Sequence, residues 1–224
     1  MQRPTSLERF GVYRYLRLIY DSYIRERLPQ KIGVYNGVPV RDRALFDVTD
    51  EQPEYEEPLV DGIEQTIQPG DTVIVVGGGR GVSAVLAARS TGVSGDVSVY
   101  EGSKEQYNLV CETVELNCLT NRIAVEFAVV SEAVSLWGKG PQASVLDPAD
   151  LPQCDVLVLD CEGAELNIVT DLTTYPRHIV VETHGNLGVP PDEMEQELKA
   201  HGYTITDREV EVPERDIVIF TASQ

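Results

Sequence analysis

Short apolar segments that alternate with helix-like segments constrain the fold more than any other feature of this sequence. The apolar segments are residues 72–76, 96–101, 123–130, 155–160 and 178–183. Strands that are apolar throughout, rather than at every second position, are buried on both faces, which is typical of parallel sheets covered by helices. The sequence therefore predicts an α/β fold built on a mostly parallel, doubly wound sheet.

The segments around these strands complete a predicted domain over residues 58–224. A loop rich in Pro and Glu at 50–58 and a short helix near 58–67 lead into it. The last two strand-like segments, 203–210 and 216–222, are expected to form an antiparallel hairpin at the end of the sheet. Further helices are expected at residues 81–90, 103–117, about 163–172 and 191–201.

The N-terminal part, residues 1–57, has a different character. An amphipathic helix is expected at 7–28, followed by a β-hairpin whose turn is the Asn36-Gly37 pair. Residues 1–31 carry seven Lys or Arg against three acidic residues, a local net charge of +4. Two interpretations of the helix stay open: it rests on an anionic membrane surface, or it packs on the domain or on a second copy of the chain.

The overall charge is strongly negative, with 37 Asp and Glu against 18 Lys and Arg and a net charge of −19. Such a surface repels phosphate groups, so nucleic acid is not expected as a partner. An acidic excess with few lysines resembles halophilic archaeal proteins, which work in molar salt that screens the charges. No apolar run approaches the roughly 18 residues of a membrane span, and no signal peptide is evident, so a cytoplasmic location is expected.

The four cysteines, Cys111, Cys118, Cys154 and Cys161, show no C-x-x-C pairing. Each lies in or beside an apolar segment. Buried free thiols are therefore expected in preference to a zinc site or disulfides.

A glycine-rich turn, "GGGRG" at residues 77–81, follows the first predicted strand and leads into a helix. Glycines allow a sharp turn and close approach of the backbone to a ligand, and the helix N-terminus offers free N–H groups. A dinucleotide fingerprint would need Gly or Ala where Val82 stands, and no Gly-Lys-Ser/Thr of a phosphate loop follows. The pattern Gly77-x-Gly79-x-Gly81 resembles the first motif of class I methyltransferases that use S-adenosylmethionine.

Acidic residues end two of the predicted strands. Glu101 closes the second strand, where a carboxylate can accept hydrogen bonds from both ribose hydroxyls of a nucleoside. Asp160, Glu162 and Glu165 follow the fourth strand. Glu162 and Glu165 are three apart, so we expect them to share one face of the helix that begins there, with Gly163 keeping the surface between them open. Helix capping accounts for one or two of these acids.

The segment "LDCEGAEL" (159–166) resembles the D-x-EGAE signature of the FkbM family of methyltransferases. Other similar segments follow the family order: "GDTVIVVGGGRGVSA", "VYEGS", "VELNCLTNRIAVEFAVVSE" and "HIVVETHG". Together they cover about residues 70–186, and "YNGVPVRD" upstream resembles versions from halophilic archaea. The resemblance implies a Rossmann-like class I fold and transfer of a methyl group from S-adenosylmethionine to a hydroxyl or carboxyl oxygen of a sugar or other small acceptor.

The resemblance also implies roles for particular residues. Cofactor binding falls to Gly77, Gly79, Gly81, Glu101, Asp160 and an adenine-edge segment that includes Ala128 and Val129. The acidic cluster facing the methyl group becomes Asp160, Glu162 and Glu165, with Glu182 and His184 on the last parallel strand. Our hypothesis is that Asp160 orients the acceptor and the cofactor, that His184 or Glu162 accepts the proton, and that Glu165 and Glu182 contact the acceptor.

One departure from the family pattern is Val75, which stands where the first motif usually has an acid. The partner of the cofactor's amino group is then expected to be Asp160 or Glu56. A divalent ion held by Asp160, Glu182 and His184 is a less favoured alternative. So are two other functions: a nucleoside-binding protein without catalysis, and a nicotinamide-dependent oxidoreductase.

Overall fold

The computed structural model describes Tyr20, Ile24 and residues 28–131 and 143–224. The predicted helix at 7–28, with its membrane or dimer contact, therefore falls almost wholly outside the described residues. None of the helices in the described part is long and apolar enough to cross a membrane.

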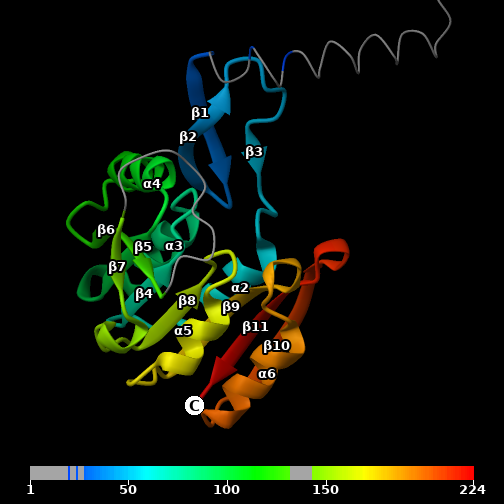
Figure 1. Cartoon of the computed structure of the whole chain (residues 1–224). Helices are drawn as coiled ribbons and strands as arrows, with labels where there is room; N and C mark the ends of the chain where they lie inside the picture. The colour runs from blue at the N-terminus through cyan, green and yellow to red at the C-terminus, as the bar shows by residue number, and fades with distance from the viewer. Residues whose placement is uncertain (1–19, 21–23, 25–27, 132–142) are drawn as a thin grey trace, which may run out of the picture.

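The larger of two sheets has eight strands in the order β10-β11-β9-β8-β4-β5-β6-β7 (Figure 1). Its parallel strands are β4 (Thr72–Val76), β5 (Asp96–Glu101), β6 (Ile123–Val130), β7 (Ser144–Leu146), β8 (Val156–Leu159) and β9 (His178–His184). The predicted parallel α/β sheet is confirmed. The short strand β7 was not predicted, because its three residues carry no apolar run.

The last two strands, β10 (Thr204–Val212) and β11 (Ile217–Ser223), form the predicted antiparallel hairpin. The second of them lies between β9 and β10 and is antiparallel to both. The chain thus reverses direction only at this end of the sheet, and the carboxyl ends of the parallel strands all meet at one edge.

Alternate residues of the buried strands face two separate hydrophobic clusters. Val73 and Val75 face the cluster that contains the helices α2 (Glu57–Thr66), α3 (Val82–Thr91) and α4 (Lys104–Leu116). Ile74 and Val76 face the other, with α5 (Glu165–Asp171) and α6 (Pro191–Ala200). Both faces of the sheet are therefore covered, as a doubly wound fold requires. The described residues also contain the 3-10 turns η3 (Gly92–Ser94), η4 (Pro148–Asp150), η5 (Gly185–Leu187) and η6 (Pro213–Arg215).

The smaller sheet has the order β2-β1-β3, with β1 (Gln30–Tyr35), β2 (Val38–Ala44) and β3 (Glu51–Gln52). The predicted hairpin turn is present: Asn36 and Gly37 have φ of 47° and 74°, the positive pair that a two-residue turn needs. The strand β3 lies inside the segment expected to be a loop and pairs in parallel with β1. Tyr35, Val38 and Val40 are buried in the same cluster as α3 and α4, so this hairpin packs directly on the larger domain.

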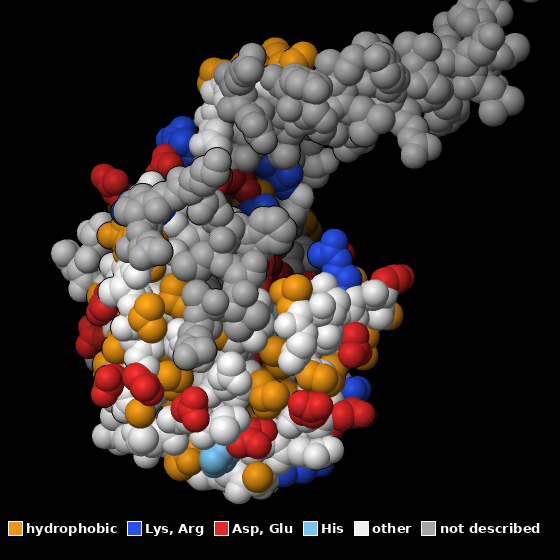
Figure 2. Space-filling model, in the orientation of Figure 1, with side chains coloured by type: hydrophobic (Ala, Val, Ile, Leu, Met, Phe, Trp, Pro, Cys, Tyr) orange, Lys and Arg blue, Asp and Glu red, His pale blue; other side chains and the backbone are white. Residues whose placement is uncertain are grey.

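The surface agrees with the acidic composition. Figure 2 shows Asp and Glu side chains scattered over the visible face instead of gathered in one patch. All four cysteines are free, as predicted, but the expected burial is not found: Cys111, Cys154 and Cys161 are half-buried and Cys118 is exposed. Cys118 lies just after α4 with φ of 58°.

Candidate active site

The glycine turn lies between β4 and α3 at the carboxyl edge of the sheet. Gly77, Gly79 and Gly81 have φ of 90°, 50° and 81°, in the region that favours glycine. A Cβ on Gly77 would overlap the carbonyl oxygen of Asp160, whereas a Cβ on Gly79 would meet nothing within 4 Å. The first glycine therefore allows β4 and β8 to approach each other, and the second leaves open space above the turn.

Glu101, at the end of β5, is bound to this turn. One carboxylate oxygen accepts hydrogen bonds from the backbone N–H groups of Gly78 at 2.9 Å and Gly79 at 3.2 Å. The other accepts from Ser103 N–H at 2.7 Å. A carboxylate offers about four acceptor positions, so about one remains for a ligand. Glu101 fixes the shape of the turn, and its contact with a ribose stays a prediction.

The turn after β8 differs from the sequence expectation. The helix α5 begins at Glu165, so Glu162 lies before it, exposed and with φ of 54°. Gly163 follows with φ of 116°, and the two positive angles fold the chain back on itself. Glu162 and Glu165 therefore do not share a helix face, and Gly163 serves the turn instead of keeping a surface open between two acids.

Glu165 is the centre of that turn and is completely buried. Its two carboxylate oxygens accept from the N–H groups of Cys161 at 3.0 Å and Gly163 at 2.9 Å. The first of these oxygens also lies 3.0 Å from Nδ1 of His184. A side chain with no exposed surface does not contact an acceptor, so the expected substrate role of Glu165 is corrected to positioning the turn and His184.

His184 joins three acidic residues from two strands and a helix. Because Nδ1 faces the Glu165 carboxylate, that nitrogen carries a hydrogen and donates it. The other ring nitrogen, Nε2, lies 3.4 Å from Glu182 Oε1 and 3.8 Å from Asp160 Oδ1. The structure thus brings together Asp160, Glu182 and His184, as predicted from their places at the ends of β8 and β9, and leaves Glu162 outside this group.

The cluster has more negative than positive groups, and its pKa values reflect this. Burial and then the nearby Glu56 raise the pKa of Asp160 to about 8. Burial and then Asp160 raise the pKa of Glu182 to about 10. For His184, burial alone would lower the pKa, but the hydrogen bond to Glu165 and the surrounding carboxylates raise it. The cluster therefore holds protons at neutral pH, or takes up a cation in their place.

Two further acids contribute to this imbalance. Glu56 precedes α2, and Glu211 lies on β10; the charge of each raises the pKa of Glu182. Glu211 was missed because β10 alternates exposed and half-buried residues, like an ordinary solvated strand. Glu182 itself is 6% exposed, and its Oε2 is buried with no hydrogen-bond partner among the described residues.

A metal would have some ligands here. Asp160, Glu165 and His184 each offer one atom within 4.8 Å of the others. Glu165 Oε1 already lies 3.0 Å from Nδ1 of His184, so an ion bound to that nitrogen would displace this hydrogen bond. The divalent ion stays a prediction.

The adenine-edge residues Ala128 and Val129 lie within β6, paired with Ser144 and Val145 of β7. Of these two, Ala128 is buried and Val129 half-buried. The segment that follows β6 at 132–142 is outside the described residues, so the cofactor contact of Ala128 and Val129 stays a prediction.

Solved structures share this fold. A ribosomal protein L11 methylase from Lactobacillus delbrueckii subsp. bulgaricus has a TM-score of 0.55 at 18% identity, over 77% of this chain and 79% of that one. A SAM-dependent O-methyltransferase from Thermotoga maritima has a TM-score of 0.54 at 17% identity, over 75% of this chain and 64% of that one. TYW2 from P. horikoshii, in complex with MeSAdo, has a TM-score of 0.56 at 14% identity, over 87% of this chain and 71% of that one.

These likenesses place the chain in a fold class. The architecture is the Rossmann-like fold of class I S-adenosylmethionine-dependent methyltransferases, as predicted. No protein-family model and no curated protein sequence matches the chain. The resemblance to the FkbM family therefore rests on the motifs of the sequence.

Proposed function

We propose that this protein is an S-adenosylmethionine-dependent methyltransferase that methylates an oxygen of a small hydroxyl or carboxyl compound. The observation that carries the proposal is the contact between Gly77 and Asp160. It sets an open glycine turn directly beside a buried cluster in which the acidic groups outnumber the single imidazole of His184. A nucleoside that carries a cationic group suits such a site, because the nucleoside can approach the glycine turn and the cation can lie beside the acids.

The residues fit the cofactor in charge and shape. The turn at Gly79 leaves space for close approach of a ligand, and α3 begins at Val82 with its N-terminal N–H groups toward the same edge. S-Adenosylmethionine has a sulfonium and an ammonium group, and the cluster around Asp160 and Glu182 has an excess of carboxylates to receive them. When bound, the cofactor supplies an electrophilic methyl group.

The chemistry of the chain's own residues then follows from their geometry. A general base works best when its pKa lies near the operating pH, and the pKa of Asp160 is about 8. We therefore assign proton acceptance from the substrate to Asp160, in place of His184 or Glu162. His184 is held by Glu165 through Nδ1, and its Nε2 faces Asp160 and Glu182 and keeps both carboxyl groups in place. Positioning of the two reactants supplies much of the acceleration in such an in-line transfer.

The polar groups at the carboxyl edge of the sheet support a sugar or another hydroxyl compound as acceptor. The Glu182 carboxyl has an oxygen, Oε2, without a partner among the described residues, and because its pKa of about 10 keeps it protonated at neutral pH, it can donate a hydrogen bond to an oxygen of a hydroxyl compound. The FkbM-like motifs favour the same acceptor class, including glycans, and the net charge of −19 disfavours RNA or DNA. The same charge and the few lysines support a working environment of molar salt, and we propose a cytoplasmic location.

A second candidate is a protein that binds a nucleoside without catalysis. The observation that favours it is Val75, which is 1% exposed and occupies the place of a motif acid. A nicotinamide oxidoreductase is less well supported, since Val82 fills the position that a dinucleotide fingerprint reserves for Gly or Ala.

Calorimetric titration in molar potassium chloride tests the proposal, with S-adenosylhomocysteine and NAD titrated in parallel. We expect micromolar binding of S-adenosylhomocysteine, weakened in Glu101→Gln, and no heat with NAD. Heat with NAD alone would replace the proposal by the oxidoreductase. Formation of S-adenosylhomocysteine from S-adenosylmethionine with a panel of sugars then separates an enzyme from a binding protein.

A further inference from the structure

Residues 53–56, which we call the strap, link β3 to α2 and cross from the small sheet to the carboxyl edge of the large one. Asn36 holds the strap through both groups of its side chain. Its Oδ1 accepts from Tyr55 N–H at 3.0 Å, and its Nδ2 donates to the Tyr55 carbonyl. The hairpin turn therefore fixes the backbone of Tyr55, one residue before Glu56.

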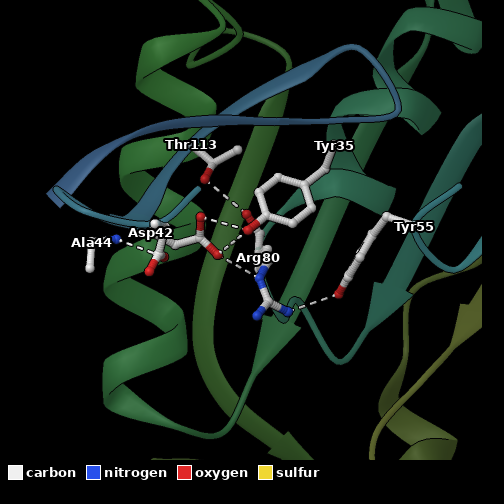
Figure 3. Close-up of polar contacts among 7 residues, drawn as sticks. Tyr35, Asp42, Ala44, Tyr55, Arg80 and Thr113 are labelled. Atoms are coloured by element: carbon white, nitrogen blue, oxygen red, sulfur yellow. Dashed lines mark hydrogen bonds and ion pairs between the residues drawn. The ribbon is translucent and has the colours of Figure 1, made fainter. Parts of the chain in front are cut away.

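The strap is also fastened to the glycine turn by Arg80. The Arg80 guanidinium donates from Nε to Asp42 Oδ2 at 2.7 Å and from Nη1 to the Tyr55 hydroxyl at 3.0 Å (Figure 3). It lies 5.5 Å from the ring centroid of Tyr35 and 5.3 Å from that of Tyr55. Arg80 belongs to the same turn as Gly79 and Gly81, so any shift of the strap is coupled to the proposed cofactor turn.

Glu56 is held by this arrangement in an unusual conformation. Its φ and ψ are 45° and 44°, in the left-handed region that is strained for a residue other than glycine. It precedes α2, yet its side chain makes no capping hydrogen bond to that helix. Strained residues that the surroundings hold in place are concentrated at functional sites. The backbone of Glu56 therefore serves to direct its carboxyl group elsewhere.

The acidic cluster around Asp160 is where we place the Glu56 carboxyl group. Burial raises the pKa of the Glu56 carboxyl, and the neighbouring Tyr55 hydroxyl acts against that rise. Glu56 directly follows Tyr55, whose hydroxyl accepts from Arg80 of the glycine turn, so the strap sets Glu56 beside that turn. In agreement with this position, the charge of Glu56 raises the pKa of Asp160, second only to burial. Arg80 is already engaged by Asp42 and Tyr55. The Glu56 carboxyl thus lies beside the proposed cofactor turn, half-buried, without a cation bonded to it among the described residues.

We propose that Glu56 binds the α-ammonium group of the cofactor's methionine moiety, and that Tyr55 and Arg80 hold it in position to do so. This inference rests on the proposed function. Val75, in the core at the end of β4, provides no carboxylate for that ammonium. Asp160 and Glu182 both face the Nε2 of His184, so the imidazole is already their partner. Glu56 reaches the same edge from the strap, on the side of the glycine turn.

The test compares two ligands that differ only in the amino acid part. S-Adenosylhomocysteine carries the ammonium group, and 5′-methylthioadenosine lacks it along with the carboxylate. Both are titrated calorimetrically into the wild-type chain, Glu56→Gln and Glu57→Gln. Glu57 is the adjacent, exposed glutamate of the first helical turn, so its variant is the matched control.

We expect Glu56→Gln to weaken S-adenosylhomocysteine about tenfold or more, since a charge-assisted hydrogen bond is lost. Binding of 5′-methylthioadenosine should change by no more than about twofold, and Glu57→Gln should change neither ligand. Equal weakening of both ligands would show that Glu56 only shapes the strap, and unchanged S-adenosylhomocysteine binding would give the ammonium to another residue; either result overturns the inference. A wild-type chain that binds neither ligand would overturn the proposed function itself.

Discussion

Two pairs of carboxylates at one edge of this sheet have opposite surroundings. Glu101 accepts three backbone N–H groups, and Glu165 accepts two together with the ring of His184. Asp160 and Glu182 instead face other acids and a single imidazole, and burial raises the pKa of both. The difference teaches that a carboxylate bonded to backbone N–H groups, such as Glu101 or Glu165, holds the structure of the site. A carboxyl group without such donors, such as Asp160 or Glu182, is available for chemistry.

The largest expected effect concerns the second pair. Asp160→Asn keeps the shape of the side chain and removes the proposed base, so turnover should fall by about 10²- to 10³-fold. Affinity for S-adenosylhomocysteine should stay within a few fold of wild type. Product formation and calorimetry on the same preparation measure both quantities. Full turnover in this variant would remove Asp160 from the mechanism.

Substitution in the first pair, Glu101 and Glu165, should lower the stability of the fold. Glu165→Gln replaces an acceptor of two N–H groups and His184 by an amide that can satisfy only part of them, deep in the fold. Loss of a buried, charge-assisted network typically destabilises by about 3 kcal/mol or more. Urea unfolding of the variant measures the loss. Glu193→Gln, an exposed glutamate in the first turn of α6, is the control and should change stability by less than about 0.5 kcal/mol.

The strands and the edge were predictable from sequence because burial on both faces leaves a continuous apolar run. The strands β4, β5 and β6 have the bounds that their apolar runs predicted. The strands β3 and β7 were not predicted, since two or three residues pair only because a neighbouring strand is in register.

The sequence predicted where the site lies, but not which hydrogen bonds its acidic side chains make. Glu101 and Asp160 were expected at this edge from strand order alone. That Glu165 turns inward while Glu162 stays exposed follows from positive φ at Glu162 and Gly163, and no pattern of side chains reveals such a turn. Glu211 arrives through the antiparallel end of the sheet, so its neighbours lie far away in sequence.

The two pairs also predict how stability changes with pH. Unfolded Asp and Glu have pKa values near 4, and folded Asp160 and Glu182 have values of about 8 and about 10. Between these limits the native state holds more protons than the unfolded state, so the free energy of unfolding falls as pH rises. His184 acts in the same direction, because its raised pKa gives stability that is lost on deprotonation.

We expect this fall between about pH 5 and about pH 8, measured by urea unfolding at constant molar salt, which screens the surface charges. Saturating S-adenosylmethionine should reduce the fall, because its sulfonium and ammonium groups favour the ionised cluster. A stability that rises over this range would mean that the carboxyl groups of Asp160 and Glu182 are already paired in the native state.

Glu182→Gln is the smallest and most discriminating change, because it removes the charge of the carboxyl whose Oε2 has no partner. At about pH 8 the native wild type must keep this group protonated, whereas the unfolded chain ionises it freely. The variant should therefore be as stable as wild type or more stable by about 1 kcal/mol.

At about pH 5 the advantage should become smaller, since the unfolded group then also holds its proton part of the time. Glu214→Gln, an exposed glutamate before β11, removes the same charge without this environment and should show no such dependence on pH. If Glu182→Gln were destabilised as strongly as Glu165→Gln, Glu182 would have a structural role like that of Glu101 and Glu165. Asp160 would then be the one acid of the four that is available for chemistry.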